Sequence, residues 1–159
     1  MNTPPVNITT LSRPDWSPQE RANAELIADF VRLVMNEHDF ATARMRFGAS
    51  DYVQHSRGIP NGMEDLLDYL ADITKRFPEY SYDVKRIHVD GELVTFHSHA
   101  TMKRSHRGDE SKGLNIIDTW RIEDGEIAEH WDAIQPLGFG MRLLSLVAGG
   151  RTRHDNGVF

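Results

Sequence analysis

The feature that most constrains the fold of this chain is a change in the spacing of its apolar residues at Pro78. Before this proline, apolar residues recur at intervals of three and four, which predicts helices beginning at Ser17, over residues 39–47 and over residues 61–77. After it, polar and apolar residues alternate. This alternation predicts four strands, over residues 80–89, 92–102, 113–122 and 127–134.

Local signals agree with this division. Ser17 and Glu20 can form a capping box at the start of the first helix, and Pro18 fits the first helical position. The pairs Asp90-Gly91 and Asp124-Gly125 are typical of tight hairpin turns. Helices followed by an antiparallel meander predict an α+β fold, with the N-terminal helices packed on one face of a curved sheet. We expect a cone-shaped hollow between them, where a small molecule can bind.

The chain of 159 residues is long enough for one domain and short for two. Residues 1–16 contain three prolines and no regular spacing, so we interpret them as a flexible arm. The domain spans residues 17–148, with a half-turn of helix over residues 143–147. Residues 149–159 are expected to form a flexible tail.

Composition excludes several classes of protein. The 18 basic and 24 acidic side chains give a net charge of −6, which argues against a nucleic-acid partner. No apolar run approaches the roughly 20 residues that cross a membrane, and no signal peptide is recognisable at the N-terminus. The chain has no cysteine, which excludes thiolate chemistry and fits a cytoplasmic location. No phosphate-binding glycine loop or nucleophile elbow is present, so we expect acid–base chemistry without a cofactor or metal.

The densest group of candidate catalytic residues lies on the last two predicted strands. Alternation places Asp118 and Trp120 on one face of the first strand, and His130 and Asp132 on one face of the second. Because the turn at residues 124–125 pairs these strands, both aspartates can face the hollow. Burial and a second carboxylate raise the pKa of such a group, so that it can take and return a proton near neutral pH. The alternative is a solvated face on which these acids pair with basic residues.

Three further histidines are candidate substrate-binding residues. His97 and His99 share one face of the second strand at about 6.5–7 Å, a spacing that suits either two metal ligands or two hydrogen-bond donors on a pocket wall. The opposite face of this strand is apolar, so the sequence leaves open which face lines the hollow. His55 lies where an extended segment meets a Gly/Pro loop, which is typical of a rim. Trp131 points away from Asp132 and indicates a partner surface.

Three segments together resemble the SnoaL-like polyketide cyclases of the nuclear transport factor 2-like superfamily, which also includes ketosteroid isomerase. They are Tyr52-Val-Gln-His55, Phe96-His-Ser-His99 and the closing run from Asp118 to Asp132, with its Asp-Gly-Glu-Ile-Ala-Glu-His-Trp-Asp ending. The resemblance covers residues 20–136 and implies a conical α+β barrel that forms a homodimer through the outer face of its sheet. It also implies that Asp132 removes a proton beside a carbonyl. The cyclases carry a histidine where this chain has Asp118.

The sequence therefore predicts a cofactor-free enzyme that acts on a small carbonyl compound by aldol-type cyclisation or proton-transfer isomerisation. Asp132 is the general acid/base, and His130 or Asp118 sets its pKa and orientation. His97, His99, His55 and Trp120 would contact the substrate. Two alternatives remain: a module that binds a small ligand without turnover, and a metal-dependent site in which His97, His99 and an aspartate hold a divalent ion.

Overall fold

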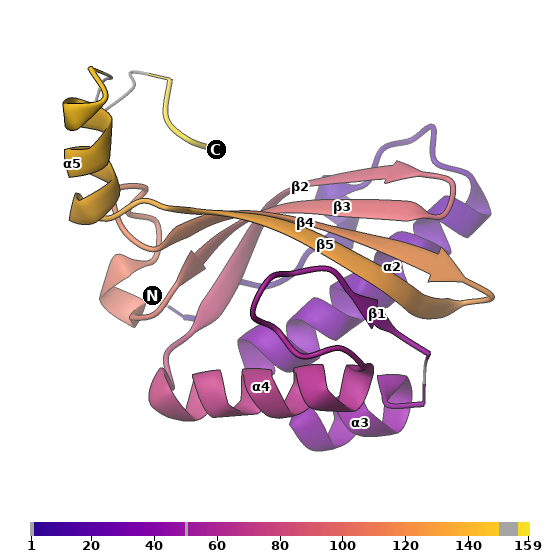
Figure 1. Cartoon of the computed structure of the whole chain (residues 1–159). Helices are drawn as coiled ribbons and strands as arrows, with labels where there is room; N and C mark the ends of the chain where they lie inside the picture. Colours follow the sequence, from indigo (N-terminus) through magenta and orange to yellow (C-terminus); the bar gives the residue numbers. More distant parts are fainter. Residues whose placement is uncertain (1, 50, 150–155) are drawn as a thin grey trace.

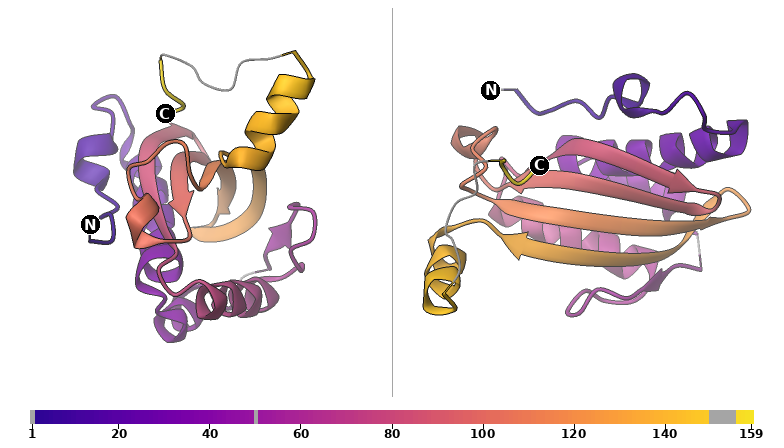
Figure 2. Two further views of the ribbon diagram at one scale, coloured as in Figure 1. Left: turned by 90° about the vertical axis from the view of Figure 1, so that its left-hand side faces the viewer. Right: turned by 90° about the horizontal axis from the view of Figure 1, so that it is seen from above.

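The central element of the structure is a curved sheet of five strands in the order β1-β5-β4-β3-β2, counted over the described residues. The computed structural model describes residues 2–49, 51–149 and 156–159. Figure 1 shows the sheet lying over the helices, and Figure 2 shows how strongly it curls. Neighbouring strands are antiparallel except for β1, which runs parallel to β5. The strands are β1 (Val53–Gln54), β2 (Ser81–Asp90), β3 (Leu93–Thr101), β4 (Leu114–Glu123) and β5 (Glu126–Pro136).

Helices α2 (Pro18–Val31), α3 (Phe40–Phe47) and α4 (Met63–Arg76) lie on the concave side of this sheet (Figure 1). Their apolar sides join the inward side chains of the strands in one buried core. The helical elements are α1 (Ile8–Leu11), α2 (Pro18–Val31), the π-helical segment η1 (Arg32–Glu37), α3 (Phe40–Phe47), α4 (Met63–Arg76), the 3₁₀ turn η2 (Arg104–His106) and α5 (Phe139–Val147). The order of elements and the single sheet confirm the predicted α+β class.

The predicted element boundaries have direct physical causes in the structure. Ser17 and Glu20 form the expected capping box at the start of α2, with Pro18 in its first turn. Both predicted Asp-Gly hairpins are present, and Gly91 and Gly125 have positive φ angles of 58° and 80°. The sequence did not anticipate α1, η1 or η2, because each is only three to six residues long.

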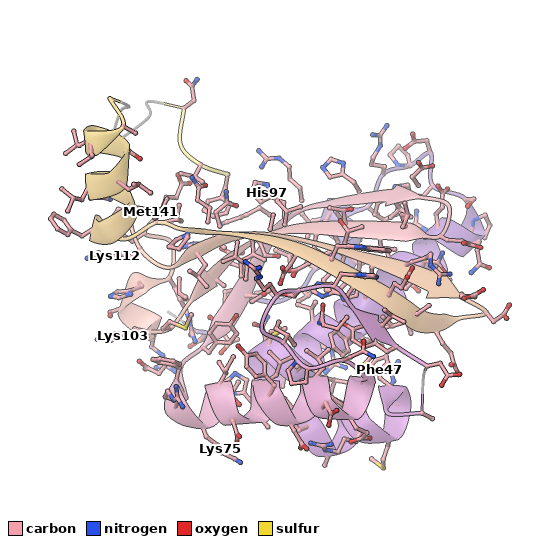
Figure 3. The ribbon with its side chains drawn as sticks, viewed as in Figure 1. Phe47, Lys75, His97, Lys103, Lys112 and Met141 are labelled. Atoms are coloured by element: carbon pink, nitrogen blue, oxygen red, sulfur yellow. The ribbon has the colours of Figure 1, made fainter. Side chains whose placement is uncertain are left out.

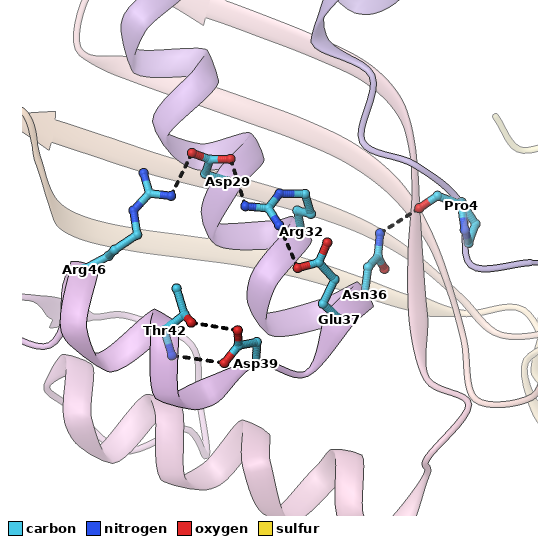
Figure 4. Close-up of polar contacts among 8 residues, drawn as sticks. All are labelled: Pro4, Asp29, Arg32, Asn36, Glu37, Asp39, Thr42 and Arg46. Atoms are coloured by element: carbon cyan, nitrogen blue, oxygen red, sulfur yellow. Dashed lines mark hydrogen bonds and ion pairs between the residues drawn. The ribbon is translucent and has the colours of Figure 1, made fainter.

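Polar contacts around η1 hold the N-terminal segment, the helices and the sheet together (Figure 4). The Asn36 side chain donates to the carbonyl oxygens of Pro4 and Tyr82, both at 3.0 Å. Its own oxygen accepts from the Tyr82 backbone N–H at 2.7 Å. Arg32 donates to Asp29 and Glu37, at 3.3 and 2.6 Å. One asparagine thus joins three parts of the chain beside a tyrosine that reaches the interior.

The two ends of the chain pack on the domain where the structure describes them. In the segment interpreted as an arm, Trp16 is buried and Ile8 contacts the core. At the other end, α5 is longer than the half-turn predicted over residues 143–147, and it stands away from the sheet in Figure 2. Phe159 lies against His97 and His99. Residues 150–155 of the expected tail lie outside the described residues, and the flexibility of arm and tail stays a prediction.

None of the helices among the described residues is long and apolar enough to cross a membrane.

Candidate functional site

A cavity of about 200 Å³ lies between the concave face of the sheet and the helices. Its wall is mostly apolar and aromatic, and its carboxyl and imidazole groups come from β4 and β5. The lining residues are Phe30, Met35, Tyr52, Ile59, Leu66, Tyr69, Leu70, Ile73, Tyr80, Tyr82, Met102, Leu114, Ile116, Asp118, Trp120, His130, Asp132 and Ile134. This is the predicted hollow, and it contains four of the seven predicted site residues.

Those four residues are brought together by the register of β4 and β5. Asp118 is directly opposite Asp132, and Trp120 is directly opposite His130. Side chains two positions apart on a strand share a face, so all four point into the cavity. One ligand atom from each of Asp118, His130 and Asp132 lies within 4.8 Å of the others. The alternation in the sequence therefore predicted this group correctly.

Asp118 is a carboxyl group with almost no access to water, since only 4% of its surface is exposed. Burial raises the pKa of Asp118, and the negative charge of Asp132 acts in the same direction. His130 and the nearby Tyr82 hydroxyl oppose this rise, because they favour the charged form. Asp118 Oδ1 lies 3.1 Å from His130 Nε2, while Oδ2 is buried with no partner at hydrogen-bond distance. The pair can hold a proton away from water and present it to a ligand.

His130 is fixed from three sides. Its ring stacks on Trp120 with a centroid distance of 5.1 Å. Nε2 faces Asp118, and Nδ1 lies 3.0 Å from Gln54 Oε1. Gln54 is not among the predicted site residues, because its contact with His130 depends on the parallel pairing of β1 with β5. The only available signal was its place in the Tyr52-Val-Gln-His55 segment.

Three tyrosines form the wall beside the carboxylates. Burial, followed by the charges of Asp118 and Asp132, raises the pKa of Tyr52. Burial also raises the pKa of Tyr80 and that of Tyr82. Their hydroxyl groups therefore keep their protons at neutral pH and can donate hydrogen bonds to a ligand oxygen.

His97 and His99, which were predicted to contact the substrate, are not among the residues that line the cavity. Phe96 and Ala100 point inward, so these histidines lie on the opposite face of β3. Figure 3 shows His97 on the side of the sheet away from α4. Its Nε2 is hydrogen-bonded to Asn115 Oδ1 at 2.7 Å, and its Nδ1 is hydrogen-bonded to the Arg86 guanidinium at 3.2 Å.

His99 is buried on that same outer face. Its Nε2 donates to the Lys112 carbonyl oxygen at 2.8 Å, and the Phe159 ring covers it. The two rings are thus hydrogen-bonded to sheet and loop groups on the convex side. The sequence alone could not show which face of β3 lines the cavity.

His55, the third histidine predicted to contact the substrate, also lies outside the cavity. It is exposed, stacks flat on Trp131 at 4.9 Å and lies 3.4 Å from Glu129. Its neighbour Gln54, the last residue of β1, contacts His130 instead, because successive side chains of an extended segment point to opposite sides. The expected direction of Trp131, away from Asp132, is confirmed by its 37% exposure.

Among the described residues, Asp118, His130 and Asp132 are also the group whose spacing could hold a metal ion. Two carboxylates and an imidazole are ligands that divalent transition metals accept. The hydrogen bond between Asp118 Oδ1 and His130 Nε2 would have to open for both atoms to bind one ion. These residues differ from the His97 and His99 pair that the sequence suggested for a metal.

Comparison with protein families gives one match. The sequence model described as the SnoaL-like domain matches residues 27–130, which include every strand residue of the cavity except Asp132 and Ile134. A comparison with curated proteins gives no match.

Solved structures share the fold. A candidate polyketide cyclase from Bacillus cereus ATCC 10987 has a TM-score of 0.61 and 20% identity, over 77% of this chain and 81% of its own. A candidate polyketide cyclase from Acidithiobacillus ferrooxidans has a TM-score of 0.61 and 19% identity, over 81% and 98%. AclR, a candidate hydroxylase from Streptomyces galilaeus, has a TM-score of 0.58 and 20% identity, over 86% and 89%. At these identities the similarity establishes the fold, and the names of these proteins already differ in chemistry.

Proposed function

Because this chain belongs to the SnoaL-like domain family, we propose that it is a cofactor-free acid–base enzyme acting on a small carbonyl compound. The observation that carries the proposal is the direct pairing of Asp118 with Asp132 across β4 and β5, inside an apolar cavity that also contains His130. Two carboxyl groups in different surroundings can divide the roles of base and acid. Asp132 is half-buried and Asp118 is fully buried, so their surroundings differ in the required sense.

In the proposed reaction, the Asp132 carboxylate removes a proton from the carbon next to a carbonyl. The C–H bond breaks, a carboxylic acid forms, and the electron pair becomes an enolate. The proton shared by Asp118 and His130, together with the tyrosine hydroxyls, stabilises the enolate oxygen. The enolate is then either reprotonated at another carbon by Asp132, which is isomerisation, or attacks a second carbonyl of the same molecule, which is aldol cyclisation. In the second case a C–C bond forms, the π bond of the second carbonyl opens, and its oxygen takes the proton from Asp132, which returns to the carboxylate.

The size of the cavity supports a small substrate. Pockets for drug-sized ligands have volumes of roughly 300–1,000 Å³, whereas this cavity has about 200 Å³. The aromatic wall favours a flat, largely apolar compound whose oxygen atoms point toward Asp118 and Asp132.

The decisive experiment follows exchange of α-protons for deuterium in D₂O by NMR, with a panel of small cyclic β-diketones and enones. We expect the wild-type protein to accelerate exchange, and Asp132→Asn to lower the rate about 10²–10⁴-fold, because it keeps the shape and removes the base. Asp124→Asn, on an exposed hairpin turn, is the matched control and should leave the rate unchanged. Near-wild-type exchange in Asp132→Asn would refute the mechanism.

The non-catalytic alternative gives a different result in the same experiment. A binding module would be stabilised against heat by a panel compound, equally in the wild type and in Asp132→Asn, without accelerating exchange in either.

The spacing of Asp118, His130 and Asp132 favours metal-dependent catalysis as a second candidate function. Mn²⁺ or Zn²⁺ would then raise the melting temperature of the wild type and be required for exchange. Asp132→Asn would abolish both effects.

We further propose a homodimer built through the outer face of the sheet, supported by the exposed apolar side chains of Ile117 and Trp131 on that face. A cytoplasmic location is also proposed, on the ground that the chain has no cysteine.

A further inference from the structure

We infer that Gln54 is a positioning residue that holds His130 in its Nδ1–H tautomer, so that Nε2 is directed to share a proton with Asp118. The inference rests on the proposed function only for its kinetic consequence. The tautomer itself follows from hydrogen bonds among the described residues.

The backbone places Gln54 beside His130. Gln54 is paired with His130 in the parallel register of β1 and β5, and the next residue, His55, donates its backbone N–H to the His130 carbonyl oxygen at 3.0 Å. The Gln54 backbone N–H donates to Asn61 Oδ1 at 2.9 Å. Strand and loop contacts thus hold the Gln54 main chain from both sides.

The orientation of the Gln54 amide is fixed independently of the histidine. The backbone N–H of Ser56 lies 2.9 Å from Gln54 Oε1, and a backbone N–H can only donate. The atom facing Ser56 is therefore the amide oxygen. The amide nitrogen, at the other position, lies 2.8 Å from the Tyr52 hydroxyl, to which it donates.

The amide then decides which nitrogen of His130 carries the hydrogen. The same Oε1 lies 3.0 Å from His130 Nδ1. An oxygen acceptor facing a nitrogen at this distance requires a hydrogen on that nitrogen, since two lone pairs would repel each other. Nδ1 is therefore the protonated nitrogen of the neutral ring.

This tautomer has a consequence for the pair with Asp118. With Nδ1 protonated, His130 Nε2 presents a lone pair to Asp118 Oδ1 at 3.1 Å, and a single proton lies between them. Stacking on Trp120 keeps the ring plane in place. The opposite tautomer would place the Nδ1 lone pair against Gln54 Oε1. Gln54 thus determines where the proton of the pair resides without touching the cavity, since it is absent from the cavity wall.

The experiment uses the full-length protein labelled with ¹⁵N-histidine, whose ring nitrogens are read by long-range ¹H–¹⁵N NMR. The His130 signals are assigned by their loss in His130→Asn. We expect Nδ1–H for His130 in the wild type. Gln54→Glu keeps an oxygen acceptor and should retain this tautomer, whereas Gln54→Leu should lose it. Gln135→Leu removes a glutamine that is bonded to Asn115 outside the cavity, and is the matched control.

Two results would overturn the inference: an Nε2–H tautomer in the wild type, or an unchanged Nδ1–H tautomer in Gln54→Leu. If Gln54→Leu does not fold, the wild type and Gln54→Glu still decide, because loss of Nδ1–H in Gln54→Glu contradicts the acceptor role.

The kinetic consequence is measured with the α-proton exchange assay. In metal sites, loss of a group that orients a ligating histidine costs about 10–100-fold in metal affinity or activity. We expect Gln54→Leu to lower kcat by a factor of the same order, with KM unchanged. Gln54→Glu should restore most of it. If the wild type accelerates no exchange at all, the proposed function is wrong. The inference about the tautomer is then tested by the NMR result alone.

Discussion

At the scale of single residues, the most informative side chain is Asp118. It lies on the concave face of the sheet between Ile116 and Trp120, where a lone carboxylate would be costly. The cost is reduced in two ways: the pKa of Asp118 is raised, so that the carboxyl can keep a proton and stay neutral, and Oδ1 is hydrogen-bonded to His130. Folding therefore makes Asp118 a weaker acid than an exposed aspartate.

This weaker acidity predicts a dependence of stability on pH. Because the folded pKa of Asp118 lies above its unfolded value, folded protein binds more protons, and stability falls as pH rises through the interval between the two values. Asp118→Asn keeps a hydrogen-bond donor for His130 and has no carboxyl group at this position, so it removes this fall in stability with rising pH. We therefore expect the unfolding free energy of Asp118→Asn, relative to wild type, to increase as pH rises above about 4 and then to level off.

Urea denaturation between pH 4 and pH 8 measures this difference. Asp124→Asn, on an exposed turn, serves as the matched control without a buried carboxyl. A relative stability of Asp118→Asn that fell with rising pH would contradict the prediction.

The sequence predicted those candidate site residues whose positions follow from the alternation of side chains along a strand. Asp118, Trp120, His130 and Asp132 follow from parity within two strands joined by one hairpin turn. The same parity could not say which face of β3 is concave, because either the apolar face or the face with the two histidines could line a cavity. His97 and His99 lie on the convex face. Gln54 could not be found, since its contact spans 76 positions of the chain.

At the scale of elements, the start of β4 depends on one close approach. Gly113 has a φ of 78°, and a Cβ at this position would overlap the carbonyl oxygen of Ala100 on β3. Gly125, in the β4–β5 turn, has a similar φ of 80° but open space around it. The two glycines therefore separate the effect of backbone conformation from that of packing.

We expect Gly113→Ala to destabilise the protein by about 1–3 kcal/mol more than Gly125→Ala, the usual cost of overpacking. Both variants incur the cost of a positive φ, about 1–2 kcal/mol. Urea denaturation of the two variants and the wild type measures the difference. Equal destabilisation by both substitutions would show that the close approach of Gly113 to β3 does not contribute to the free energy of unfolding.

The elements themselves were largely predictable, because their signals are local. The capping box of α2 and the two Asp-Gly hairpins need only neighbouring residues. By contrast, Asn36 in the π-helical segment η1 donates hydrogen bonds to Pro4 and Tyr82, which are 32 and 46 positions away in the chain. The parallel pairing of β1 depends on a strand of two residues, too short for any spacing to reveal.

At the scale of the whole molecule, the two faces of the sheet differ in what covers them. Helices and cavity occupy the concave face, while the convex face leaves Ile117 and Trp131 36% and 37% exposed. A second copy placed there would bury these apolar side chains, as stable interfaces do over about 1,200–2,000 Å².

This proposed dimer predicts an effect of a charge at the centre of the outer face. Ile117→Asp should convert a dimer into a folded monomer, because an unpaired carboxylate would be buried at the interface. Met45→Asp, on the exposed surface of α3, is the control and should remain dimeric. Sedimentation velocity gives the mass of each species. A wild type that is monomeric at micromolar concentration, or a dimeric Ile117→Asp, would contradict the proposed interface.

The two-residue strand β1 carries Gln54 at the edge of an otherwise long-stranded sheet. Short edge segments open at a lower free energy than the centre of a sheet. Warming would therefore release Gln54 while β2 to β5 stay paired, and His130 would lose the hydrogen bond that fixes the proton on its Nδ1. The proposed activity would then be lost at a temperature below that at which the whole protein melts, and it would return on cooling without refolding of the sheet.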